Sequence, residues 1–361
     1  MAKETLGRVL DAKKAGLDPT AVDYSNLDIR EEHHVLKVVP NRIYSVAFAP
    51  INSTVIAWCG EKWGRLGAWR PFVEDPENAS IMLTPHSRAI SSIACPPSHP
   101  HLVFTSSYDQ SVRVLDAERG VCLEALLWDT LMTYCVVEDG GQIVWASSND
   151  GEVVRVDRRE SGGARGEKAG DSSGTASYHA PQGVKLHERT VGSVDLHPDG
   201  RTILTASLDG TACLWDVRRW PMGKAARSKP LASFAHDQGV SSAFFSPSGN
   251  RFVSTSHDDH LRVWEGGVAA KDPPSVSIPH NNHTGRWLSN FRTVWDPRDD
   301  STLLIGAMGT REIEAFSATS GRRIAHRRSD YLTAVPTLNC VHPVLPYVVS
   351  GTASGRLHLW T

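Results

Sequence analysis

The amino-acid sequence predicts an all-β fold, a ring of seven small antiparallel sheets arranged as the blades of a β-propeller. The stretch from His187 to Trp215 resembles the stretch from His236 to Trp264, and each spans the same 28 positions. Weaker copies run over 43–69, 86–116, 133–157, 291–317 and 335–360, which makes seven. The last strands of successive copies lie 41 to 59 residues apart. Most of these gaps fit the roughly 40–45 residues that a four-stranded blade needs.

The residues inside each copy favour short strands joined by tight turns. In the fourth copy, the run Thr202–Ser207 is followed by Leu208-Asp209-Gly210 and then by the run Thr211–Asp216. The runs in the other copies are likewise short and rich in β-branched or aromatic residues, with Gly and Asp at the turns. Each copy is therefore expected to form antiparallel strands.

We expect one propeller domain over 35–361, preceded by a partly disordered leader over 1–34 with a short helix from Lys3 to Lys14. The chain ends at Thr361, directly after the third strand of the last copy, so the last blade would have an unpaired edge. The apolar stretch Val35–Val39 lies ahead of the first blade and can supply the missing outer strand. The Gly- and Ser-rich segment 158–183 has no periodicity and is expected to be a flexible insertion between the third and fourth blades.

Composition narrows the classes of function. The formal net charge is −2, so nucleic acid would have to bind at a local basic patch and not through bulk charge. No run of about 18 apolar residues could cross a membrane, and the first residues do not resemble a secretory signal. The six cysteines are scattered with no C-x-x-C pair, which is typical of reduced thiols and predicts neither a zinc site nor a disulfide framework.

A repeated set of His, Ser or Thr, Asp and Trp has the residue types of a nucleophile, a base and an acid. The fourth copy contains it as His187, Thr205, Asp209 and Trp215, and the fifth copy contains it as His236, Ser254, Asp258 and Trp264. A set that recurs from blade to blade is expected to stabilise the blades by hydrogen bonds, whereas nucleophilic catalysis needs one convergent site. Phosphate-loop and hydrolase motifs are absent from the sequence. We therefore expect no enzyme activity and no cofactor.

The repeat does not explain the segment 280–292, which lies between the fifth and sixth copies and contains no acidic residue. Its Arg286 and Trp287 suit a groove in which an indole stacks on a base and a guanidinium group meets a phosphate. The alternative is that Trp287 packs under a neighbouring loop. His280 and His283 could in principle share a metal ion, but Pro279 and Gly285 disfavour the helix that this spacing would need.

Three motifs, in their order along the chain, resemble those of the nuclear Cmr-type DNA damage-binding protein / WD repeat-containing protein 76 family of WD-repeat propellers. They are GEKWGRLGAW at 60–69, TSSYDQSVRVLD at 105–116 and H-N-N-x-T-G-R-W-L-x-x-F-R at 280–292. The resemblance implies a nuclear, chromatin-associated protein, monomeric within larger complexes, that binds damaged or distorted duplex DNA on one narrow face. The DNA-binding residues implied here are Lys62, Trp63, Arg65, Arg88, Arg113, His280, Asn281, Asn282, Arg286 and Trp287.

A further motif, Leu214-Trp-Asp-Val-Arg218, ends the fourth copy. The blade explains Trp215 and Asp216, but the repeat does not require Arg218. Propellers that dock onto the adaptor of the cullin-4 ubiquitin ligase often carry this W-D-x-R pattern, and Val156-Asp-Arg-Arg159 is a degraded second copy. The resemblance therefore implies docking through Trp215, Asp216 and Arg218, although the pattern also arises by chance in WD repeats. The alternative to DNA binding is a protein-interaction scaffold.

Overall fold

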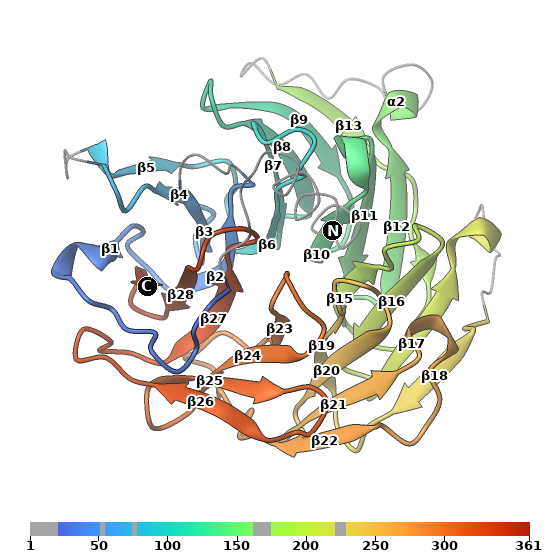
Figure 1. Cartoon of the computed structure of the whole chain (residues 1–361). Coiled ribbons are helices and arrows are strands. Elements are labelled where there is room, and N and C mark those ends of the chain that lie inside the picture. Colours follow the sequence, from blue (N-terminus) through green and yellow to red (C-terminus); the bar gives the residue numbers. More distant parts are fainter. Residues whose placement is uncertain (1–20, 51–54, 74–77, 162–174, 221–228) are drawn as a thin grey trace.

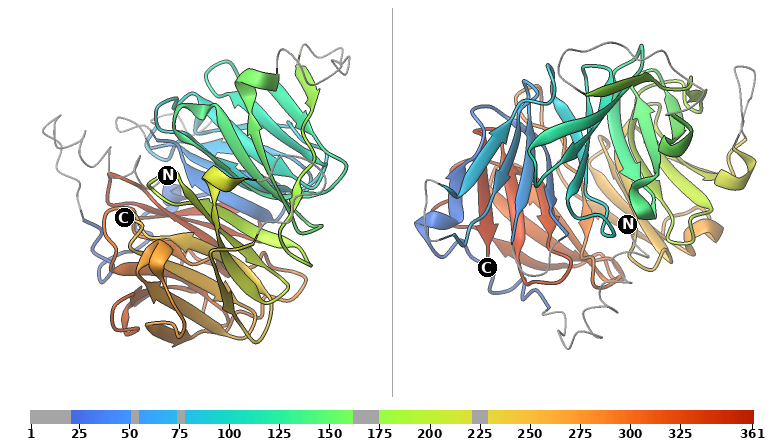
Figure 2. Two further views of the ribbon diagram at one scale, coloured as in Figure 1. Left: turned by 90° about the vertical axis from the view of Figure 1, so that its right-hand side faces the viewer. Right: turned by 90° about the horizontal axis from the view of Figure 1, so that it is seen from above.

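The computed structural model describes residues 21–50, 55–73, 78–161, 175–220 and 229–361. Seven sheets, antiparallel apart from one added outer strand, stand around a central channel, and each sheet forms one blade (Figure 1). Two further views, each turned by 90° from Figure 1, show the blades side by side from the edge of the ring (Figure 2). The predicted seven-bladed propeller is confirmed.

Blades 1 and 3 have four strands each, and blade 2 has five. Blade 1 contains β2 (Ile43–Phe48), β3 (Ala57–Glu61), β4 (Leu66–Trp69) and β5 (Ser80–Leu83). Blade 2 contains β6 (Ile90–Ala94), β7 (Leu102–Ser107), β8 (Ser111–Asp116) and β9 (Val121–Leu127), and β13 (Ala176–His179) adds a fifth strand. Blade 3 contains β10 (Met132–Val137), β11 (Ile143–Ser148), β12 (Glu152–Asp157) and β14 (Val184–Lys185).

The remaining blades follow the same plan. Blade 4 contains β15 (Val191–Leu196), β16 (Thr202–Ser207), β17 (Thr211–Asp216) and β18 (Ala232–Ala235). Blade 5 contains β19 (Val240–Phe245), β20 (Arg251–Ser256), β21 (His260–Glu265) and β22 (Val276–Pro279). Blade 6 contains β23 (Val294–Trp295), β24 (Thr302–Ala307), β25 (Glu312–Ser317) and β26 (Arg323–Arg327). Blade 7 contains β27 (Pro336–Val341), β28 (Val348–Thr352), β29 (Arg356–Trp360) and β1 (Val35–Lys37).

Helical structure in the described residues is confined to single turns. They are η1 (Glu32–His34), η3 (Asp139–Gly141), α2 (Arg158–Ser161), η4 (Val217–Arg219) and η5 (Gly267–Ala269). Within the described ranges no helix has the length and apolar character needed to span a bilayer.

The ring closes as predicted, because the N-terminal strand β1 completes the last blade. Its residues pair antiparallel with β29, Val35 opposite His358 and Leu36 opposite Leu357. The strand is shorter than the predicted Val35–Val39, since the amides of Val38 and Val39 both donate to the Gly355 carbonyl in a turn. The pairing gives blade 7 its fourth strand and joins the two ends of the domain by hydrogen bonds.

The expectation of a solvent-side leader over 1–34 is wrong for the residues that the structure describes. Val22, Tyr24, Leu27 and Ile29 are buried in one cluster with apolar residues of blades 6 and 7. The Tyr24 hydroxyl donates to Asp296 at 2.8 Å. The segment is thus held by apolar burial together with hydrogen bonds, and the domain begins before residue 35. The predicted helix over 3–14 lies outside the described residues.

The expectation of a flexible insertion over 158–183 is wrong at both ends of that range. Arg158 begins the short helix α2 and forms an ion pair with Glu124, with 2.8 Å between Nε and Oε2. Strand β13 pairs parallel to β9, which places the end of the insertion on the outer edge of blade 2. Residues 162–174, in the middle of the range, lie outside the described part of the chain.

The repeated polar set is a structural network in blade 4, as predicted. His187 Nδ1 lies 2.9 Å from Asp209 Oδ2, and His187 Nε2 lies 2.7 Å from Thr205 Oγ1. The Trp215 indole donates to the same Thr205 oxygen at 2.8 Å. Burial alone would raise the pKa of Asp209, but the hydrogen bonds from His187 and Thr211 outweigh it and hold that pKa below its usual range. The corresponding set in blade 2 is His86, Thr105 and Asp109.

Blade 5 departs from the predicted network. His236 Nε2 still lies 2.8 Å from Ser254 Oγ, but Asp258 forms an ion pair with Arg262 at 2.7 Å. The Trp264 indole donates to Asp272 at 3.2 Å instead of to the serine. In blade 5, Arg262 thus replaces the histidine as the partner of Asp258, and Asp272 replaces the serine as the acceptor of the Trp264 indole.

The buried N-terminal segment generates a stability prediction. Ile29 is 1% exposed, whereas Ile324 on the outer strand β26 is 48% exposed. Ile29→Ala should lower the free energy of unfolding by about 2–4 kcal/mol, because it leaves a cavity in a packed cluster. Ile324→Ala is the matched control and should cost less than about 1 kcal/mol. Denaturant unfolding measures both, and equal effects would show that the segment does not stabilise the ring.

Candidate nucleic-acid interface

The three sequence motifs come together on one face of the ring for a topological reason. Because neighbouring strands of a blade are antiparallel, the loop that enters a blade and the turn between its second and third strands lie at the same end of the sheet. Lys62, Trp63 and Arg65 lie in the β3–β4 turn, Arg88 lies in the β5–β6 loop, and residues 280–292 form the β22–β23 loop. We call this end of the ring the loop face.

The β22–β23 loop, here called the crossing loop (280–292), reaches across the mouth of the channel. Figure 1 shows the segment ahead of β23 extending to the middle of the ring. The Ser289 hydroxyl donates to the Ile43 carbonyl in blade 1 at 2.6 Å. Arg292 donates to the Ser91 carbonyl in blade 2 at 3.2 Å, and its guanidinium carbon lies 5.1 Å from the centre of the Tyr134 ring in blade 3. A loop that leaves blade 5 thus contacts three blades across the channel.

Two of the predicted DNA-binding residues are buried and hold the crossing loop in place. His280 Nδ1 lies 2.7 Å from Asn282 Oδ1, and the side-chain amide of Asn282 donates to the Ser256 carbonyl at 2.8 Å. The His280 ring also packs edge-on against Phe291. The prediction that His280 and Asn282 face DNA is therefore wrong, because neither side chain is exposed. Asn281 is exposed, as a contact residue would be.

Two exposed tryptophans on the loop face each lie against a cationic side chain. Lys62 Nζ lies 4.9 Å from the centre of the Trp63 ring, and the Arg286 guanidinium carbon lies 4.7 Å from the centre of the Trp287 ring. Trp63 is 55% exposed and Trp287 is 74% exposed. Trp287 therefore does not pack under a neighbouring loop. Each pair offers a flat apolar surface beside a positive charge, which suits a base next to its phosphate.

Trp63 stands where other blades use an acid. The pairing of β3 with β4 places Cys59 opposite Gly67, as the pairing of β7 with β8 places Thr105 opposite Arg113. In this register Trp63 corresponds to Asp109, which contributes to the blade 2 network. At this position blade 1 has a solvent-exposed indole in place of the acid that stabilises blade 2.

Arg42 joins the two cation–aromatic pairs, and sequence reasoning missed it. Its guanidinium group donates to the carbonyls of Arg286 and Leu288 at 2.8 and 3.1 Å and to the Tyr44 hydroxyl. Its own carbonyl accepts the Lys62 amide at 3.1 Å. The available signal was its position just ahead of the first strand of blade 1, where the topology places residues at the channel mouth.

The other predicted basic residues divide into two groups. Arg88 is exposed and Arg65 is half-buried, so both are accessible from the loop face. Arg113 lies inside strand β8, and its Nε is buried. Its charge acts on His86, lowering the pKa of that histidine further after the larger effect of burial. Arg113 is thus half-buried beside the blade 2 network and not on an exposed turn of the loop face, and its contact with DNA stays a prediction.

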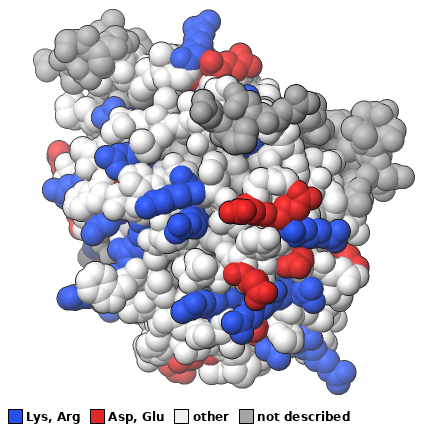
Figure 3. All heavy atoms as spheres, turned by 90° about the vertical axis from the view of Figure 1, so that its left-hand side faces the viewer, with Lys and Arg blue, Asp and Glu red and all other residues white. Residues whose placement is uncertain are grey.

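Charge is unevenly distributed among the exposed residues of the loop face. Positive residues lie in the loops and turns that belong to or lead into blades 1, 2 and 6, namely Lys62, Arg88, Arg286 and Arg311. The loops and turns of blades 3, 4 and 5 carry the negative residues Asp129, Asp150, Glu188 and Asp237, and one exposed cation, Arg189. The outer side of the ring in Figure 3 likewise carries Lys and Arg over most of its height, with Asp and Glu in smaller groups. A net charge near zero thus coexists with a local positive field.

The W-D-x-R motif lies on the opposite face, where the third strands end. Arg218 makes a bidentate pair with Asp216, with 3.0 Å from Nε to Oδ1 and 2.9 Å from Nη2 to Oδ2. Arg159 and Asp157 repeat this pair on neighbouring blade 3. The pair holds Arg218 against the end of blade 4 while 65% of its side chain stays exposed, and docking through this residue stays a prediction. Trp215 is buried and cannot itself touch a docked partner.

One group of metal-ligating side chains is found among the described residues, and it lies away from the crossing loop. Donor atoms of Glu31, His33 and His34 lie within 4.8 Å of one another ahead of β1. His33 already pairs with Glu31 at 3.0 Å, and His34 is buried.

Comparison with known proteins agrees with the repeat and with the motifs. The model of the WD domain, G-beta repeat family matches residues 79–116, 182–216 and 228–265, which contain the first three strands of blades 2, 4 and 5. WD repeat-containing protein 76 of Xenopus laevis is 32% identical over 92% of this chain and 55% of its own length. DNA damage-binding protein cmr1 of Neurospora crassa is 31% identical over 98% of this chain and 71% of its own length. The chain belongs to this CMR1 and WD repeat-containing protein 76 family.

Family members extend beyond the region that this chain matches. The chain spans 55% of the length of WD repeat-containing protein 76 from Xenopus laevis and from Rhinolophus ferrumequinum, to which it is 32% and 30% identical. The similarity covers the whole propeller of this CMR1 family chain, including the crossing loop and the β3–β4 turn.

Arg42 generates a prediction about the crossing loop. Arg42→Ala removes two charge-assisted hydrogen bonds to the loop, so amide hydrogen exchange over 284–289 should become about tenfold faster or more. Arg88→Ala is the matched control, because Arg88 is exposed on the same face and its side chain makes no hydrogen bond to the described residues. Unchanged exchange in the Arg42 variant would mean that other contacts suffice to fix the loop.

Proposed function

We propose that this propeller is a non-enzymatic nuclear protein that binds damaged or distorted duplex DNA on its loop face and acts on chromatin in the DNA damage response. The observation that carries the proposal is the pair of exposed cation–aromatic sites, Lys62 with Trp63 and Arg286 with Trp287, joined through Arg42. The printed name of the Neurospora crassa relative, DNA damage-binding protein cmr1, supports the same function.

The geometry suggests a division of roles. Arg286, Arg88 and Lys62 would meet phosphates, which positions the duplex without reading its sequence. Trp287 would stack on a base or enter between base pairs, and this costs less where the duplex is already unstacked. The preference for distorted DNA then comes from the lower cost of deformation and not from base-specific hydrogen bonds.

The crossing loop is well suited to carry a wedge. Its base is fixed by the buried His280 and Asn282, and its far end is fixed by Arg42 and Ser289. A side chain on a fixed loop loses little conformational freedom on binding, so more of the stacking energy appears as affinity. The negative residues of blades 3, 4 and 5 would repel phosphate and direct the duplex over blades 6, 7, 1 and 2.

We also propose that the opposite face docks onto the adaptor of a cullin-4 ubiquitin ligase, which would make the protein a substrate receptor. Asp216 holds the exposed Arg218 guanidinium in a fixed orientation, and Arg159 presents a second one on the next blade. A fixed planar guanidinium is a good partner for a carboxylate or a row of carbonyls. Because the two surfaces lie at opposite ends of the blades, DNA and adaptor could be bound together.

The DNA proposal predicts distinct effects for the two residues of one pair. Trp287→Ala should lower affinity for lesion-bearing duplex by roughly one to two decades at any salt concentration, since stacking of one base is worth about 1–3 kcal/mol. Arg286→Ala should also reduce the slope of log affinity against log salt by about one unit, because one phosphate contact is lost. Fluorescence anisotropy at two salt concentrations measures both, with exposed Arg201 on the opposite face as the Arg→Ala control. If both variants bind like the parent, the protein-interaction scaffold becomes the better explanation.

The adaptor proposal is tested by Arg218→Ala. This variant should keep the melting temperature of the parent, because the guanidinium is mostly exposed, and should lose recovery of the adaptor from cell extract. Arg119→Ala, which removes an exposed arginine beside Asp116 on blade 2, is the matched control and should recover the adaptor normally. Full recovery by the Arg218 variant would exclude docking through this residue.

A further inference from the structure

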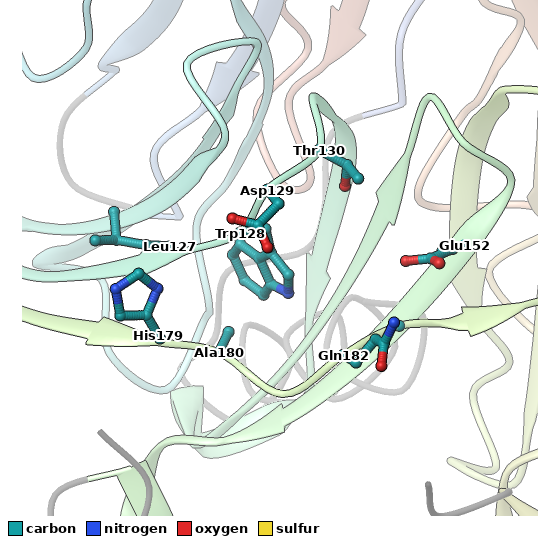
Figure 4. Close-up of a pocket in the computed structure, with 9 residues that line it drawn as sticks. Leu127, Trp128, Asp129, Thr130, Glu152, His179, Ala180 and Gln182 are labelled. Carbon is teal, nitrogen blue, oxygen red and sulfur yellow. The ribbon is translucent and has the colours of Figure 1, made fainter. Parts of the chain in front are cut away.

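A pocket lies on the loop face at the outer edge of the ring, between blades 2 and 3 and away from the crossing loop. Its volume is about 350 Å³, which is at the small end of the roughly 300–1,000 Å³ typical of ligand pockets. Figure 4 shows the Trp128 indole in the middle of the site, with Asp129 beside it and Glu152 and Gln182 across from it. The lining of the pocket thus combines one aromatic ring with two carboxylates.

The walls of the pocket are fixed by hydrogen bonds. The Trp128 indole donates to the Pro181 carbonyl at 3.2 Å, and the Ala180 amide donates to the Leu127 carbonyl at 3.0 Å. The strand β13, which comes from the insertion, pairs with β9 immediately before this point. The end of the insertion therefore completes a site that the seven blades alone would leave open.

The position of Glu152 requires a glycine opposite it. A Cβ added at Gly183 would lie 2.6 Å from Glu152 Oε2, which is closer than real contacts allow. The Glu152 side chain therefore lies directly against the Gly183 backbone and is held toward the pocket. Burial raises the pKa of Glu152, the neighbouring Asp150 raises it further, and Lys185 partly opposes both effects.

Neither carboxylate of the pocket is paired directly with a cation, although Lys185 lies near enough to lower the pKa of Glu152. Within the described part of the chain, neither Asp129 nor Glu152 has a hydrogen bond or an ion pair at its carboxylate. The ammonium group of Lys185 is hydrogen-bonded to the Asp150 carbonyl. A ligand that brings a positive charge to this site would therefore gain two unused acceptors and the face of an indole.

We propose that this pocket binds a lysine side chain, free or methylated, from a basic segment of a partner protein. The aliphatic stem of lysine would lie along the Trp128 ring, with its ammonium group attracted by the Asp129 and Glu152 carboxylates that line the same pocket. DNA is excluded as the occupant because the pocket is negative. The inference does not depend on the DNA proposal, since none of the pocket residues belongs to the crossing loop or to the β3–β4 turn.

The test uses three labelled peptides, Ser-Gly-Ala-X-Ala-Gly-Ser, in which X is lysine, trimethyllysine or norleucine. Norleucine keeps the stem and lacks the charge, so fluorescence anisotropy with the full chain should show at least one cationic peptide binding roughly tenfold tighter than the norleucine peptide. Tighter binding of trimethyllysine assigns more of the attraction to Trp128, and tighter binding of lysine assigns more to the carboxylates. Equal binding of all three peptides overturns the proposal.

Variants of the two acids locate the effect. Asp129→Asn together with Glu152→Gln preserves shape and removes both charges, so the preference for a cationic peptide should fall at least fivefold. Glu118→Gln, which changes an exposed acid on the opposite face, is the control and should retain the preference for a cationic peptide. Neither change should weaken binding of duplex DNA, which separates failure of this inference from failure of the DNA proposal. A double variant that retains the full preference would show that the cation binds elsewhere.

Discussion

The pairing of three residues, Val35–Lys37, with strand β29 is the interaction on which the rest of the ring depends. It joins the first segment of the domain to the last one, so each blade gains two neighbours. The turn that follows is possible only with glycine at position 355. That residue has φ +79, and a Cβ there would lie 1.9 Å from the Val39 carbonyl oxygen. The close approach lets the amides of Val38 and Val39 share one acceptor and sends the chain into blade 1.

The closing segment also organises the candidate interface. Arg42 follows the closing strand by five residues, and its guanidinium and carbonyl groups hold the crossing loop and the β3–β4 turn respectively. Ring closure and positioning of the aromatic pairs therefore use the same short stretch of chain. The loop face then divides into a positive part near this stretch and a negative part over blades 3 to 5, where the pocket of Trp128 lies. Such a surface can accept a polyanion and a basic protein segment side by side.

Much of this arrangement follows from the sequence, and the exceptions have physical reasons. The spacing of His187 and Trp215, with its weaker copies along the chain, predicted seven blades, and the apolar stretch Val35–Val39 predicted the closing strand. Topology alone placed Trp63 and Trp287 on the same face. Burial within the crossing loop could not be predicted, because the depth of His280 depends on Phe291 and on partners in another blade. Arg42 was missed because the carbonyls that it binds lie more than 240 positions away in the sequence.

The crossing loop has a mechanical consequence. It is attached to blades 5 and 6 at its ends and to Arg42 and Ile43 in its course, so it bridges the seam that β1 and β29 close. If the ring opens where β1 pairs with β29, the hydrogen bonds from Arg42 and Ser289 that hold the crossing loop must also break. Their loss adds to the activation barrier for unfolding. A ligand seated on the loop would hold the bridge in place and lengthen the lifetime of the folded ring beyond what its equilibrium stability requires.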